Sequence, residues 1–269
     1  MNALSKNCYS LAILLLTGLL VTACSSDNAL PDLDARTEPV LKKIDPQTEQ
    51  QDVKVRKARF FEQLRPVVDA ENERTLAIRA ALKSLRDKAE SGELTAGENS
   101  WLNDVASRYK IEADAEGRHD FATLLRRVDV VPVSLALSQA AMESAWGRSR
   151  FAQEGNNLFG QWCFSKGCGI VPSQRAAGLT HEVAKFKTVN AAVRAYLENL
   201  NRHPTYVSLR DVRQGIRRGR VTKTPGIDMA VGLENYSELG NEYVEHISSV
   251  IRQNKLSQYN RHLVQGTPQ

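Results

Sequence analysis

Apolar residues recur at three- and four-residue intervals along most of the chain, a spacing that is typical of amphipathic helices. The pattern begins at Val53, and Pro66 predicts a kink or a break there. A second helical stretch ends at Gly92, because glycine commonly follows the last turn of a helix. Further helices are expected at 99–109, 119–128, 132–146, 190–204, 208–219 and 241–254.

Between Cys168 and Lys187 the pattern changes to two short extended segments around Gly178, which predict a β-hairpin. The expected fold is therefore mainly α (α+β), with helices before and after a small β-hairpin lobe. We expect an N-terminal helical region at 53–120, a second domain at 121–260 and a short tail at 261–269.

The N-terminus predicts export. Lys6 precedes an apolar stretch from Leu11 to Leu20 that is too short for a lasting membrane span and fits the core of a signal peptide. Cys24 follows small residues, as in a bacterial lipobox, and Ser25 resembles the residue found after the cysteine in lipoproteins sorted to the outer membrane. Residues 1–23 are thus expected to be a lipoprotein signal peptide; a plain secretory signal is the alternative.

Lipidation of Cys24 would leave the protein at the outer membrane, anchored by lipid and facing the periplasm. Residues 24–52 are polar, contain three prolines and show no periodic apolar face. They predict a flexible tether with few contacts.

Charge and cysteine content add limited information about partners. A net charge of +5 suits a polyanionic partner but identifies none, and export argues against nucleic acid. The basic stretch 213–223 is interpreted as a solvated helix end and loop, with contact to wall or lipid anions as the alternative.

Cys163 and Cys168 predict a disulfide in an oxidising compartment, because a zinc site would need two further ligands nearby. No metal or organic cofactor is expected.

One carboxylate is unusual in its surroundings. Glu143 is the single charged side chain between Val130 and Gly147. On a continuous helix its face also carries Ala136, Gln139, Ala140, Trp146 and Gly147, with no cation among them, and Trp146 would supply a dry wall beside the carboxyl. A desolvated carboxyl has a raised pKa, and a glycosidase uses such an acid to protonate the leaving oxygen. The alternative is a buried structural carboxylate paired with Arg148 or Arg150, and the residues alone do not decide between the two.

The stretch SQAAMESAWGRSRFAQEGNNLFGQW resembles the signature of the bacterial glucosaminidase family, which is glycoside hydrolase family 73-like. From about Phe60 onward the chain resembles Bax-type proteins of proteobacteria. The resemblance is carried by Gln139-Ala140, Glu143-Ser144, Trp146-Gly147, Asn156-Asn157, Phe159-Gly160 and Ala184-Lys185-Phe186. It implies a lysozyme-like helical fold with a small β-lobe, and hydrolysis of the β-1,4 bond after N-acetylglucosamine in peptidoglycan. By this resemblance Glu143 is the general acid.

The same resemblance suggests substrate contacts. Trp146 and Phe159 are expected to line sugar subsites, with Gln139 and Asn157 as further substrate-binding candidates. Tyr206 is a weaker candidate for this role.

The second catalytic group is harder to place. Relatives often carry a second acid on the first strand of the β-lobe, where this chain has none, and the nearest candidate is Glu182. An exposed structural acid is the simpler interpretation of Glu182. Tyr236 matches a family tyrosine and is expected to assist, unless the acetamido group of the substrate takes the second role.

Two other functions stay open at this point. A muramidase or lytic transglycosylase needs only one acidic residue, and a wall-binding lipoprotein would keep the cleft without turnover. In each case the expected partners are peptidoglycan glycan strands and, through Cys24, a membrane.

Overall fold

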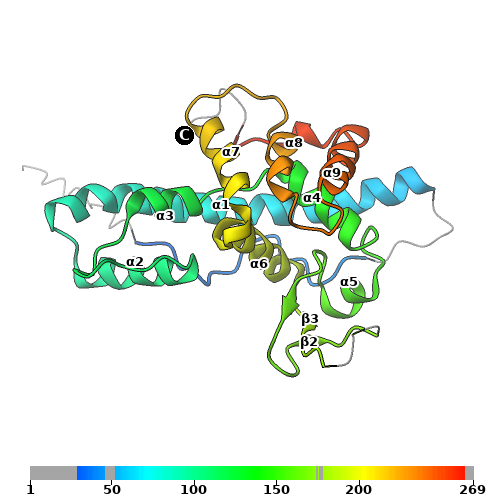
Figure 1. The fold of residues 1–269 in the computed structure, drawn as a ribbon, viewed down its shortest axis with the longest axis horizontal. Helices are drawn as coiled ribbons and strands as arrows, with labels where there is room; N and C mark the ends of the chain where they lie inside the picture. Colours follow the sequence, from blue (N-terminus) through cyan, green and yellow to red (C-terminus); the bar gives the residue numbers. More distant parts are fainter. Residues whose placement is uncertain (1–28, 46–51, 174, 176–177, 264–269) are drawn as a thin grey trace, which may run out of the picture.

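The computed structural model describes residues 29–45, 52–173, 175 and 178–263, and in them it is mainly helical with one small sheet (Figure 1). This confirms the expected fold class. The helices are α1 (Val53–Ser91), α2 (Ala96–Arg108), α3 (Phe121–Arg127), α4 (Val133–Glu143), α5 (Arg150–Gly155), α6 (Val189–Arg202), α7 (Val207–Arg217), α8 (Pro225–Ala230) and α9 (Asn241–Gln253). The periodic pattern did not identify the short helices α5 and α8.

Helix α1 extends across most of the molecule (Figure 1). It begins after Asp52, whose side chain accepts hydrogen bonds from the amides of Lys54 and Val55, and it ends at Gly92 with a φ of 74°. The predicted stop at Gly92 is confirmed, whereas a break at Pro66 is wrong because the helix continues through that residue. Leu64 and Val67 on either side of Pro66 are buried, and this packing holds the helix together despite the missing amide donor.

Two hydrophobic clusters share α1. The first half of α1 packs in the main cluster with side chains of α4, α6, α8 and α9, and the second half packs with α2 and α3. The expected boundary at residue 120 therefore does not divide the core, because Phe60 and Leu64 lie in the same cluster as Leu135 and Leu137 of α4.

The described part of the expected tether, residues 29–45, packs against the helices, which corrects the prediction of a segment with few contacts. Ile44 is buried in the main cluster, and Leu33 is buried in the second. The amide of Val189 donates a hydrogen bond of 2.9 Å to the carbonyl of Leu41. At the other end, Leu263 from the expected tail is also buried in the main cluster. Apolar side chains are too sparse in these segments to show a period, but they reach existing hydrophobic surfaces.

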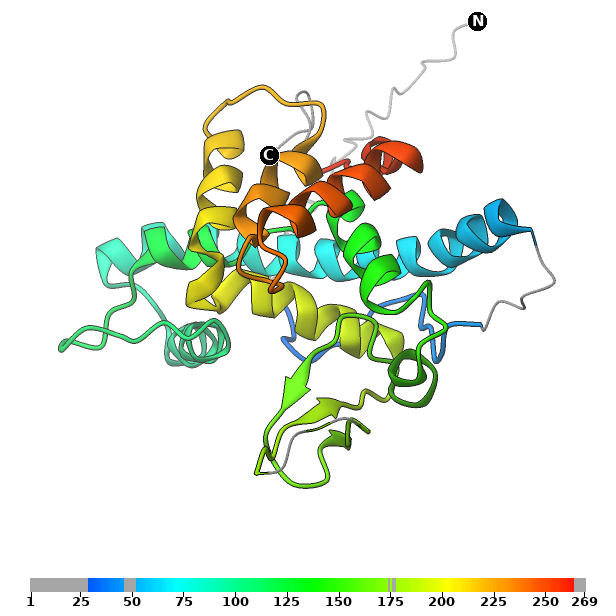
Figure 2. The same ribbon diagram turned by 45° about the vertical axis from the view of Figure 1, so that its right-hand side comes forward.

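The sheet forms a lobe beside α5 and α6, and α4 ends toward it (Figure 2). Its strands are β1 (Trp162–Cys163), β2 (Gly169–Ile170) and β3 (Glu182–Ala184), in the order β1-β3-β2 with both pairs antiparallel. The segments on either side of Gly178 pair as predicted, with Gly169 opposite Ala184, and β1 adds an edge that was not predicted. A side chain at 169 would collide with the carbonyl oxygen of Val183, so this register requires glycine.

Cys163 and Cys168 form the expected disulfide at the end of β1. Cys24 and the expected signal peptide lie outside the described residues. No helix in the described ranges is long and apolar enough to cross a membrane.

Candidate active site

Helix α4 carries the candidate acid at its last position. All nine residues from Val133 to Ala141 are buried, so the helix is fixed on every side before it reaches Glu143. The hydroxyl of Ser144 then donates to the carbonyl of Ala140 at 2.5 Å and accepts from the amide of Gly147 at 2.7 Å. Glu143 is thus held at the end of a rigid element.

The chain turns sharply after Glu143, which corrects the prediction of a helix through Trp146. Ala145, Trp146 and Gly147 all have positive φ values, of 50°, 61° and 78°. This run of left-handed residues ends the helical spacing that placed Trp146 on the face of Glu143.

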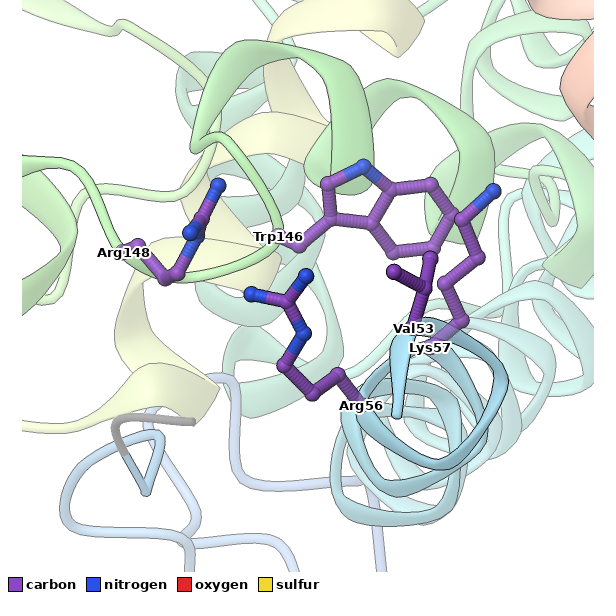
Figure 3. A pocket seen from close by; sticks show the side chains of 5 residues that line it. All are labelled: Val53, Arg56, Lys57, Trp146 and Arg148. Atoms are coloured by element: carbon purple, nitrogen blue, oxygen red, sulfur yellow. The ribbon is translucent and has the colours of Figure 1, made fainter. Parts of the chain in front are cut away.

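Trp146 consequently packs on α1 (Figure 3). Its ring makes edge contacts with Phe60 and Phe61, at centroid distances of 5.9 and 5.4 Å, and the ammonium of Lys57 lies 4.7 Å from its centroid. The indole lines a pocket together with Val53, Arg56, Lys57 and Arg148. It was expected to form a wall beside the carboxyl of Glu143. The expectation that Trp146 shields Glu143 is therefore not met.

The carboxyl of Glu143 is half-buried between α9 and the β-lobe. Oε1 accepts a hydrogen bond of 2.7 Å from the hydroxyl of Tyr243. On the other side, a side chain at Gly160 would come within 3.8 Å of Oε2, so the backbone leading into β1 passes directly beside the acid. Burial raises the pKa of Glu143, and the Tyr243 hydrogen bond, which favours the charged form, offsets only part of that rise.

The structural alternative for Glu143 required an ion pair with Arg148 or Arg150. Arg148 Nε instead donates to the carbonyl of Ala145 at 3.3 Å, and Arg150 Nη2 donates to the carbonyl of Val171 at 2.9 Å. Within the part of the chain that the structure describes, no cation is paired with Glu143. The carboxyl is consequently suited to carry a proton.

A chain of hydrogen bonds fixes the position of the acid. The hydroxyl of Tyr196 donates to Gln139 Oε1 at 2.6 Å, and Gln139 Nε2 donates to the hydroxyl of Tyr243 at 3.0 Å. With its oxygen accepting from Gln139, the Tyr243 hydroxyl donates its proton toward Glu143. Gln139 is fully buried, and both its amide oxygen and its amide nitrogen are hydrogen-bonded. It therefore positions Tyr243, which corrects the prediction that Gln139 contacts the substrate.

Tyrosine rings form the wall that Trp146 was expected to supply. Tyr236 stacks on Tyr243 at 5.4 Å with an interplanar angle of 8°, and Tyr206 lies 6.0 Å from Tyr236. The hydroxyl of Tyr236 donates to the carbonyl of Phe159 at 2.9 Å and thereby ties the wall to the β-lobe. Burial raises the pKa of Tyr236 and of Tyr243, so both remain protonated donors at neutral pH.

Phe159 and Asn157 shape the turn that carries Gly160, which corrects their prediction as substrate contacts. Phe159 is buried and stacks on Tyr196 at 3.9 Å. Asn157 Nδ2 donates to the carbonyls of Gln161 and Ala184 at 2.8 and 2.9 Å, and its Oδ1 accepts from the amide of Gln161 at 3.0 Å. Both residues act on the site through the backbone beside Glu143.

Glu182 binds the disulfide loop. Its two carboxylate oxygens accept from the amides of Gly167 and Gly169 at 2.9 and 2.8 Å, and these hydrogen bonds lower its pKa. Because both oxygens of this carboxylate accept hydrogen bonds from backbone amides, Glu182 serves to hold the loop. These contacts do not support the prediction that Glu182 is a second catalytic acid. Cys163 and Cys168 lie near this carboxylate, but their sulfurs are joined to each other and offer no thiolates to a metal.

Two residues of the hydrogen-bonded chain were missed as site residues. Tyr243 lies in the helix expected at 241–254 and Tyr196 in the helix expected at 190–204, and neither was singled out from the sequence. The sequence did contain a signal for both residues, namely a tyrosine on a helix face that is otherwise apolar. The hydroxyl of a buried tyrosine usually has a hydrogen-bond partner, so each tyrosine predicts a buried polar contact.

The model of the glucosaminidase family, described as mannosyl-glycoprotein endo-beta-N-acetylglucosaminidase, matches residues 118–256. The chain is 34% identical to Protein bax of Escherichia coli (strain K12) over 203 residues, which cover 74% of this chain and 70% of the relative. A solved structure, the catalytic domain of the autolysin Auto from Listeria monocytogenes, aligns with 66% of this chain and 96% of its own. The TM-score of that alignment is 0.37 and the sequence identity is 20%.

Proposed function

Because the chain belongs to the glucosaminidase family of glycoside hydrolases, we propose that it hydrolyses peptidoglycan as an endo-β-N-acetylglucosaminidase with Glu143 as general acid. The observation that carries this proposal is the environment of Glu143. Burial raises the pKa of this carboxyl, the hydroxyl of Tyr243 donates a hydrogen bond to it, and the β-lobe backbone passes on its far side. A protonated carboxyl in such a setting donates its proton to a leaving oxygen.

In the proposed reaction, Glu143 transfers its proton to the glycosidic oxygen as the bond to the anomeric carbon of N-acetylglucosamine breaks. Glu182 on β3 is engaged by the amides of Gly167 and Gly169, so in this proposal the acetamido oxygen of the substrate takes the second role and attacks the anomeric carbon. Glu143, now a carboxylate, next accepts a proton from the water that opens this intermediate. Tyr236 and Tyr243 supply hydrogen bonds and a rigid wall, and do not react.

The bond that is cut identifies the activity. Digestion of purified peptidoglycan should release fragments with N-acetylglucosamine at the reducing end, as read by mass spectrometry after borohydride reduction. Reducing N-acetylmuramic acid would show a muramidase, and anhydro ends would show a lytic transglycosylase. Either result would overturn the proposed specificity; a muramidase would still be a glycoside hydrolase, whereas a lytic transglycosylase cleaves the glycosidic bond without water.

The pH dependence should respond to Tyr243. A general acid works only while protonated, so the rate should fall as pH rises through the pKa of Glu143. The Tyr243 hydrogen bond lowers that pKa, so a Tyr243→Phe variant should move the alkaline limb of the pH–rate profile to higher pH. A Tyr259→Phe variant is the matched control, because Tyr259 lies against Arg65 in the described structure. An unchanged or lowered alkaline limb in Tyr243→Phe would contradict this role.

Location rests on the sequence alone. We propose a lipid anchor on Cys24 that holds the enzyme at the outer membrane and exposes it to the periplasm. The support is the apolar stretch from Leu11 to Leu20 and the small residues before the cysteine. It stays a prediction, since residues 1–28 lie outside the described ranges.

A further inference from the structure

We propose that Trp162 on β1 is a sugar-binding platform next to Glu143, and that an N-acetylhexosamine ring of the glycan strand stacks on its indole. This inference rests on the proposed function, because it assigns a subsite to the same substrate. It replaces Trp146 and Phe159, which the structure packs against α1 and Tyr196.

Exposure distinguishes Trp162 from the other two tryptophans. It is 60% exposed, whereas the indole of Trp101 donates to the carbonyl of Pro31 and Trp146 packs on α1. The ring of His181 stacks on one face of Trp162, with centroids 4.2 Å apart and planes 16° apart. Trp162 is therefore held flat from one side. An exposed indole combines an apolar face with a hydrogen-bond donor, which are the two features that a pyranose ring can use.

Its position along the chain places Trp162 close to the acid. Gly160, whose backbone lies beside Glu143 Oε2, is two residues away. Two peptide units span at most about 7.6 Å between Cα atoms. A sugar bound on the indole would thus lie within one or two sugar units of a glycosidic oxygen at Glu143. An exposed apolar side chain at the edge of a catalytic site indicates a contact with ligand more strongly than an isolated one on a convex surface does.

Several contacts keep the platform rigid. β1 pairs with β3 so that Trp162 lies opposite Val183, and the next residue, Cys163, is tied to Cys168 by the disulfide. The disulfide closes a short loop, and Glu182 holds this loop by accepting hydrogen bonds from two backbone amides. A ring that is ordered before binding loses little conformational entropy on binding. The proposal therefore gives the disulfide and Glu182 a functional consequence, namely the support of a substrate contact.

Sugar binding can be measured apart from catalysis. In a Glu143→Gln background, isothermal titration with chitohexaose should give a Kd that rises at least about tenfold on Trp162→Ala, the usual cost of truncating a central aromatic contact. Trp162→Phe should keep the Kd within about threefold, because it retains a flat ring. Val221→Ala removes an exposed apolar side chain between α7 and α8 and should leave the Kd unchanged.

A second measurement does not depend on the folding of the alanine variant. In the Glu143→Gln protein, the indole N–H resonance of Trp162, assigned by its absence in Trp162→Phe, should shift when chitohexaose is added. An unshifted resonance at saturation would overturn the platform, as would an unchanged Kd in a folded Trp162→Ala variant. The latter result would also arise if the exposed ring served a protein partner.

The two proposals fail separately. Normal hydrolysis by Glu143→Gln would remove the assigned acid while Trp162-dependent binding would still stand. Loss of hydrolysis in Glu143→Gln together with Trp162-independent binding would remove only the platform.

Discussion

Replacing Glu143 with glutamine should lower the rate of muropeptide release by about 100- to 10,000-fold, the range that a positioned general acid contributes. Glutamine keeps the shape of the side chain and can still accept the Tyr243 hydrogen bond, but it has no proton to transfer at any working pH. The fold should therefore survive while the chemical step is lost. Soluble muropeptides released from purified peptidoglycan, measured by chromatography at matched protein concentration, give the rate.

Glu154→Gln is the matched control for this experiment. Glu154 is an exposed acid on α5, eleven positions after Glu143, and the same substitution there should leave the rate unchanged. Equal release by wild type and Glu143→Gln would refute the catalytic role of Glu143, and no release by either protein would favour the wall-binding lipoprotein. Equal loss in both variants would instead indicate a general effect of charge on substrate binding.

Replacing Arg213 with methionine should destabilise the fold by about 3–5 kcal/mol, the usual cost of removing one partner from a buried ion pair. Arg213 is 1% exposed, and its Nη1 donates to the carbonyl of Val130 at 2.9 Å and to Asn201 Oδ1 at 2.6 Å. Its Nε lies 3.8 Å from the carboxylate of Asp129, which Arg217 also binds at 2.7 Å. Burial alone would raise the pKa of Asp129, but these guanidiniums hold it below its ordinary value.

The reason for the large effect is that methionine would leave several buried acceptors without a donor. Among these acceptors, the carbonyls of Asp129 and Val130 lie in the segment that leads into α4, so the loss of their donor would loosen the helix that carries Glu143. Guanidinium chloride denaturation measures the free energy of unfolding. Arg218→Met, at the exposed end of the same helix, should change it by no more than about 0.5 kcal/mol. A change below about 1 kcal/mol in Arg213→Met would show that the network is not needed for stability.

Arg213 also shows where sequence interpretation fails. The basic stretch 213–223 was interpreted as a solvated helix end and loop, and Arg213 within it is buried. Side chains in a run of like charges normally repel one another and face water. Here α7 places Arg213 against the carboxylate of Asp129. The sequence does not reveal that Asp129 lies at this position in the fold.

The amino-acid sequence by itself determined the parts of this protein that depend on local patterns. Apolar spacing located most of the helices, the extended segments around Gly178 located the hairpin, and two nearby cysteines indicated their disulfide. The composition around Glu143 singled out a carboxyl with no charged neighbour on its helix. These features are encoded within short stretches of chain, so periodicity and composition are sufficient to read them.

Only the tertiary structure decided what surrounds that carboxyl. The hydroxyl of Tyr243 comes from 100 residues away, and Tyr196 reaches Gln139 across 57. Left-handed residues after α4 turned Trp146 toward α1, and pairing of β1 with β3 fixed Trp162 opposite Val183. Contacts of this kind depend on how helices and strands pack against one another, and no local pattern in the sequence specifies that packing.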